Sequence, residues 1–89
     1  MSIEIDNIIL GFRASVMGEI LSHRNTNGAG TVAAFKVDVN RHLQRSLDKL
    51  RHLPGDVAET TTATLNDTAD SVIARIEAAG VVEFADGVI

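Results

Sequence analysis

The segment RHLPGDVAE, residues 51–59, is the most sharply defined turn in the sequence. Pro54 cannot continue a helix and Gly55 readily adopts turn conformations, so a helix arriving from the N-terminal side must end here. Asp56 is followed three residues later by Glu59, which is the spacing of a capping box at the start of a new helix. The segment therefore predicts the tip of a helical hairpin.

The residues before this tip predict a helix over 31–53, with Thr31 as its N-cap. Its apolar residues recur every three or four positions, as on one face of a helix. They are Val32, Phe35, Val39, Leu43, Leu47, Leu50 and Leu53. Residues 31–39 also alternate between apolar and polar in the manner of a strand. The alternative is therefore an α+β fold, in which a short strand at 31–39 pairs with the tail at 81–86.

The residues after the tip predict a second helix over 56–79, with Gly80 as its C-cap. Small and apolar side chains follow one another at alternating intervals of four and three, which is the spacing of a heptad seam. The seam consists of Ala58, Thr62, Leu65, Ala69, Val72, Ile76 and Ala79. This helix and the helix over 31–53 form the two arms of the hairpin.

A third helix is predicted over 3–22, and it is apolar on nearly all sides. One stripe contains Ile5, Ile9, Phe12, Val16 and Ile20, with Ile8 beside it. A helix of this kind is normally buried on more than one side. Either the other two helices wrap around it, or its second face contacts another subunit, which is the reading we favour. That candidate interface consists of Ile3, Leu10, Gly11, Ala14, Met17, Gly18 and Leu21.

These elements together predict an all-α fold of three helices, formed by residues 1–89 as one domain. Residues 81–89 are expected to be a flexible or docking tail.

Hydrophobic residues make up 45% of the chain, but Phe is the only aromatic type and there is no Cys. The core is therefore aliphatic, and disulfides and thiolate metal sites are excluded.

The sequence lacks the signals of export and of membrane insertion. Its N-terminal segment carries Glu4 and Asp6 where a signal peptide would be basic. The apolar stretch 8–12 is much shorter than the ~20 residues of a membrane span. We expect a cytoplasmic protein without a membrane span, with leaderless export or association with a virion as alternatives.

The charges are separated along the chain. Residues 36–52 hold five Lys or Arg and two acidic residues, whereas the whole chain has a net charge of −4. The simplest interpretation is that the basic and acidic arms of the hairpin match each other. The alternative is a basic patch that meets an acidic partner or nucleic acid, although the net charge makes nucleic acid an unlikely main partner. The candidate patch consists of Arg41, Arg45, Lys49 and Arg51.

No pattern in the sequence indicates catalysis, a cofactor or a metal site. His23, His42 and His52 are not spaced as ligands along one helix, and no glycine-rich phosphate-binding motif is present. We therefore expect a non-enzymatic interaction or structural subunit that acts through helix–helix contacts and associates with itself. The alternatives are a small inhibitor or regulator, of the type carried by phages and mobile elements, that occludes a larger machine, and a nucleic-acid-binding accessory.

Overall fold

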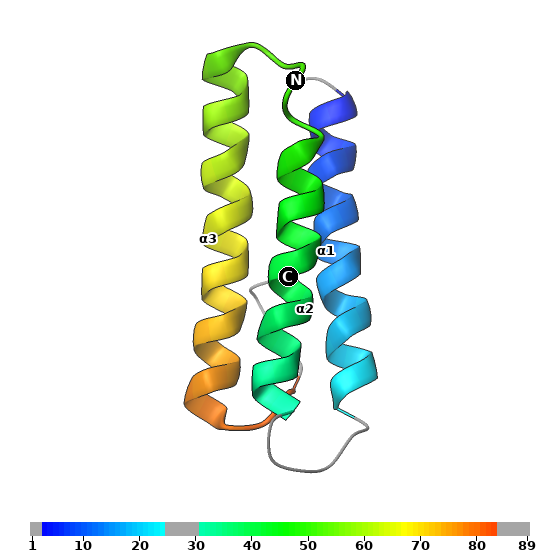
Figure 1. The fold of residues 1–89 in the computed structure, drawn as a ribbon, viewed down its shortest axis with the longest axis vertical. Coiled ribbons are helices and arrows are strands. Elements are labelled where there is room, and N and C mark those ends of the chain that lie inside the picture. The colour runs from blue at the N-terminus through cyan, green and yellow to red at the C-terminus, as the bar shows by residue number, and fades with distance from the viewer. Residues whose placement is uncertain (1–2, 25–30, 84–89) are drawn as a thin grey trace.

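The computed structural model describes residues 3–24 and 31–83, and these residues form an all-α arrangement of three helices. The helices are α1 (Ile3–His23), α2 (Thr31–Asp48) and α3 (Gly55–Ala79). They run alternately up and down along the long axis, and each contacts both of the others (Figure 1). The predicted fold class is confirmed. The alternative strand at 31–39 is wrong because these residues lie in α2.

The core consists of aliphatic side chains and two buried phenylalanines, Phe12 and Phe35. From α1 the buried residues are Ile8, Phe12, Val16 and Ile20, and from α2 they include Phe35, Val39 and Leu43. Ile8 is buried more deeply than Ile5 and Ile9, so the inner stripe of α1 follows a regular spacing of four. Such rows every four residues form the ridges by which helices pack against each other.

The helix before the hairpin tip ends at Asp48, earlier than the predicted Leu53. Beyond it the backbone forms tighter turns, in which Leu50 N–H donates to the Leu47 carbonyl at 3.0 Å and Leu53 N–H to the Leu50 carbonyl at 3.1 Å. Bonds of this i to i−3 type often tighten the last turn of a helix, and Pro54 disfavours a helical conformation for the residue before it. The apolar face nevertheless continues, since Leu50 is buried.

The hairpin tip is confirmed, but the predicted capping box is wrong. Pro54 is the N-cap of α3, and no side chain caps this end. Its carbonyl accepts a hydrogen bond from Ala58 N–H at 2.9 Å, which places Asp56 inside the first turn. There the carboxylate favours the helix through its dipole. At the other end, Gly80 is the C-cap as predicted, with a φ of 75° and its N–H bonded to the Ile76 carbonyl.

The heptad seam of α3 is buried over its central part. Leu65, Ala69, Val72 and Ile76 are all in the core, as predicted, whereas Ala79 is exposed. At the N-terminal end, Thr61 is buried in place of the expected Thr62. The Thr61 hydroxyl donates to the Val57 carbonyl at 2.9 Å, so its burial leaves no unsatisfied donor.

The chain beyond α3 still contributes to the core through Val82, which is buried. The rest of the predicted tail, residues 84–89, lies outside the described residues. Within the described part of the chain, no helix has both the length and the apolarity needed to cross a membrane.

Candidate functional site

The outer face of α1, the candidate interface, is exposed along the helix. Ile3 is 77% exposed, Leu10 58% and Leu21 44%. Gly11, Ala14 and Gly18 are also exposed, and Met17 is half-buried. Neither α2 nor α3 covers this face, because both pack against the opposite stripe of α1.

The two glycines on this face are not close to any other part of the described chain. A Cβ atom built at Gly11 or at Gly18 would meet nothing within 4 Å. Each glycine costs roughly 0.5–1 kcal/mol in a helix relative to alanine. No packing within the described chain explains that cost.

The exposed residues form a regular pattern once Asn7 is included. Residues 3, 7, 10, 14, 17 and 21 are spaced alternately by four and three, which is the spacing of a coiled-coil seam. We call this set the outer seam, and it consists of Ile3, Asn7, Leu10, Ala14, Met17 and Leu21. Asn7 was not among the predicted interface residues, because it is neither apolar nor small.

The four residues of the candidate basic patch are all exposed. Two of them pair with an acid three residues earlier: Arg41 Nη2 lies 2.8 Å from Asp38 Oδ1, and Arg51 Nη2 lies 3.1 Å from Asp48 Oδ1. Arg45 and Lys49 lie on the surface of the same arm.

The two arms of the hairpin are joined by an ion pair of the kind that the charge pattern predicts. It connects Lys36 Nζ and Glu77 Oε2, which are 3.1 Å apart. Exposed pairs of this kind contribute about 0–1 kcal/mol each. The charge difference between the arms therefore favours their pairing only weakly.

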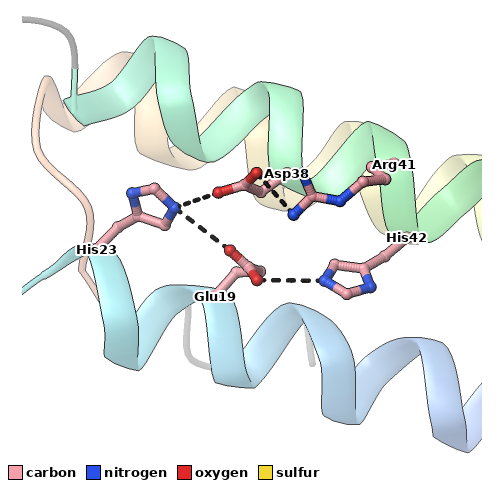
Figure 2. A network of polar contacts seen from close by, with 5 residues as sticks. All are labelled: Glu19, His23, Asp38, Arg41 and His42. Carbon is pink, nitrogen blue, oxygen red and sulfur yellow. Dashed lines mark hydrogen bonds and ion pairs between the residues drawn. The ribbon is translucent and has the colours of Figure 1, made fainter.

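A second group of polar residues joins α1 to α2 where α1 ends and α2 begins (Figure 2). We call it the histidine–carboxylate cluster. Glu19 and His23 are one helical turn apart on α1, and Asp38 and His42 are one turn apart on α2. Side chains four residues apart lie on the same face of a helix, so the antiparallel packing places the two pairs opposite each other.

The cluster is centred on Nε2 of His23, which lies 2.6 Å from Asp38 Oδ2 and 3.3 Å from Glu19 Oε2. The second oxygen of each carboxylate has a partner further out. Glu19 Oε1 lies 3.2 Å from Nε2 of His42, and Asp38 Oδ1 forms an ion pair with Arg41. Figure 2 shows these contacts as one connected network.

The cluster is partly shielded from water. The side chains of His23, Glu19 and His42 are 14%, 19% and 19% exposed. The ring of His23 also packs edge-on against the buried Phe35, with ring centroids 5.9 Å apart. The hydrogen bond with His23 lowers the pKa of Asp38 below its ordinary value; partial burial opposes this effect, and the contacts with Glu19 and Arg41 add to it.

This cluster was not predicted from the sequence, because the spacing of the histidines relative to one another does not reveal their pairing with carboxylates. A signal was present in two short patterns, Glu19-x-x-x-His23 and Asp38-x-x-x-His42. The third histidine, His52, lies apart from the cluster and pairs with Glu4 at the other end of α1.

Comparisons of the chain with protein-family models, with curated proteins and with solved structures give no match.

Proposed function

We propose that this chain is a non-catalytic helical interaction subunit that associates with itself, each copy packing the outer seam of α1 against the outer seam of a second copy. The observation that carries this proposal is the exposure of that seam. It follows a heptad spacing over most of α1, yet Ile3 is 77% and Leu10 58% exposed. A seam of this spacing is suited to packing along a second helix.

A second copy is the favoured partner because the outer seam is complementary to itself. The bulky residues Leu10 and Met17 line one edge of the face, while Gly11 and Gly18 line the other edge. In a parallel pair related by a two-fold axis, the bulky edge of one helix lies beside the glycine edge of the other. The absence of Cβ atoms there allows the two backbones to approach closely.

The residues that flank the outer seam are compatible with this arrangement. Asp6 and Arg13 lie on the flank beside the bulky edge, and in the parallel pair they face the glycines of the second copy and not like charges. Asn7 occupies a position within the outer seam, between Ile3 and Leu10. A single polar residue at such a position can fix the register and the number of helices, at some cost in stability.

The predicted pair is weak because the outer seam is a narrow strip. Stable interfaces bury about 800 Å² on each partner. For a chain that exposes 5319 Å² in total, that would be roughly 15% of the surface. A single strip along one helix covers less than this, so we expect association in the micromolar range.

The test is the oligomeric state, measured by light scattering and sedimentation over a range of concentrations. We expect a dimer at about 100 µM that dissociates on dilution. Leu10→Glu places a charge on the outer seam and should give a monomer. Val37→Glu is the matched control, because Val37 is similarly exposed, at 64%, but lies on α2.

A wild-type chain that is monomeric at about 100 µM would contradict the proposal. An equal loss of association in Leu10→Glu and Val37→Glu would also contradict it, since the effect would then not belong to the outer seam. Circular dichroism of both variants controls for folding. Because both side chains are exposed, the helical signal should be unchanged.

A further inference from the structure

The histidine–carboxylate cluster contains the types of ligand that bind a transition metal. Glu19, His23 and Asp38 each offer one donor atom, and these three atoms lie within 4.8 Å of one another. Imidazole nitrogens and carboxylate oxygens are ordinary ligands of Zn²⁺. The three side chains come from two different helices, so an ion held by them would connect α1 to α2.

The two distances from His23 to the carboxylates are close to those of a metal site. With metal–ligand bonds of about 2.0–2.1 Å, two ligand atoms of a tetrahedral zinc site lie roughly 3.3 Å apart. The distance from His23 Nε2 to Glu19 Oε2 is 3.3 Å. The distance from His23 Nε2 to Asp38 Oδ2 is 2.6 Å, so the carboxylate of Asp38 would have to move by less than about 1 Å.

The electrostatics of the cluster also favour a cation at its centre. Oxygens of two carboxylates converge on the same nitrogen of His23. An ion bound to this nitrogen would lie within reach of both carboxylates, which would attract it. The partial burial of these side chains strengthens the interaction with an ion.

We propose that this cluster is a Zn²⁺ site, with His23 Nε2, Glu19 Oε2 and Asp38 Oδ2 as its protein ligands. Water fills the fourth position, as it does in other sites with three protein ligands. The ion takes the place of the direct hydrogen bond between His23 and Asp38.

The neighbouring residues hold the ligands in the required orientation. Arg41 binds the Oδ1 atom of Asp38, and His42 binds the Oε1 atom of Glu19, so each carboxylate turns its other oxygen towards His23. The edge-on contact with Phe35 fixes the plane of the His23 ring. Such outer contacts typically change metal affinity by about 10- to 100-fold when they are removed.

The ligand set also predicts which ions bind. Imidazole with carboxylate suits Zn²⁺ and its neighbours Co²⁺, Ni²⁺ and Cu²⁺. Mg²⁺ and Ca²⁺ prefer sites made of oxygen alone. We therefore expect Co²⁺ to substitute for Zn²⁺, and an excess of Mg²⁺ to leave the zinc affinity unchanged.

The test is a titration of the full, untagged chain with Zn²⁺ in competition with a chromophoric chelator. We expect one ion per chain, and a loss of at least about tenfold in affinity for His23→Gln and for Asp38→Asn. His52→Gln is the matched control, because His52 also pairs with a carboxylate but lies outside the cluster. Its affinity should equal that of the wild type.

A second measurement on the wild-type chain does not depend on how the variants fold. Addition of Zn²⁺ should shift the NMR signals of the His23 ring and leave those of His52 in place. The proposal is overturned if no ion binds, or if His52→Gln and His23→Gln lose affinity equally, since zinc would then be held by scattered surface groups. Unshifted His23 signals at saturation would overturn it as well.

Discussion

The inner stripe and the outer seam of α1 both contain large aliphatic residues, but they lie in opposite environments. Val16 and Ile20 on the inner stripe have no exposed surface, whereas Leu10 on the outer seam is 58% exposed. The inner stripe repeats every four residues and the outer seam alternates between four and three. The stripe that enters the core is large and apolar at every position, whereas the outer seam also contains Asn7 and Ala14. The inner stripe is the one that packs against α2 and α3.

The largest expected effect comes from shortening a residue of the inner stripe. Phe12 is 1% exposed and belongs to the core. Phe12→Ala should lower the free energy of unfolding by about 3–5 kcal/mol, because it removes buried apolar surface and leaves a cavity. Urea denaturation followed by circular dichroism measures this loss. A cost below about 1 kcal/mol would mean that the inner stripe is not the core.

Much of this fold could be predicted from the sequence because its signals are local. Pro54 and Gly55 identify the hairpin tip, and Gly80 identifies the end of α3. The start of α3 was harder to predict, since Asp56 and Glu59 have the spacing of a capping box without forming one. A backbone carbonyl, that of Pro54, accepts the hydrogen bond that begins the helix.

The histidine–carboxylate cluster could not be predicted in the same way because it depends on how two helices are aligned. The pairs Glu19/His23 and Asp38/His42 are visible in the sequence, but many helices carry such pairs on a solvated face. Only the antiparallel packing of α1 against α2 brings the two pairs together. The outer seam was predictable as a face, but its exposure became known only from the packing.

The second prediction concerns the glycines beside the outer seam. In an isolated chain, Gly11→Ala with Gly18→Ala should raise the free energy of unfolding by about 1–2 kcal/mol in total, since alanine is the better helix former. Neither new methyl group would touch another part of the described chain. Denaturation at a concentration well below that of self-association isolates this effect.

The same double variant should weaken self-association at high concentration, because the new methyl groups hold the two helices apart. Light scattering of the double variant beside the wild type measures this second effect. A variant that is more stable as a monomer and associates as well as the wild type would show that the glycine edge is not part of the contact.

The third prediction compares one substitution at two positions of α1. Ile20 has no exposed surface, and Ile3 is 77% exposed. Ile20→Val should cost about 0.5–1.5 kcal/mol, because it removes a buried methylene group. Ile3→Val should stay within about 0.5 kcal/mol in dilute solution. Equal costs at the two positions, measured by urea denaturation, would remove the distinction between the stripes.

The smallest expected effect on folding belongs to Leu10→Ala. In dilute solution the free energy of unfolding should change by less than about 0.5 kcal/mol, because the leucine is exposed and alanine favours a helix. At high concentration the wild-type chain should become more stable relative to the variant, since association stabilises the folded state by mass action. The difference between the two chains should therefore grow with concentration. A difference that stays constant across the range would mean that Leu10 contributes nothing to association, and the outer seam would then be an exposed face without a partner at this position.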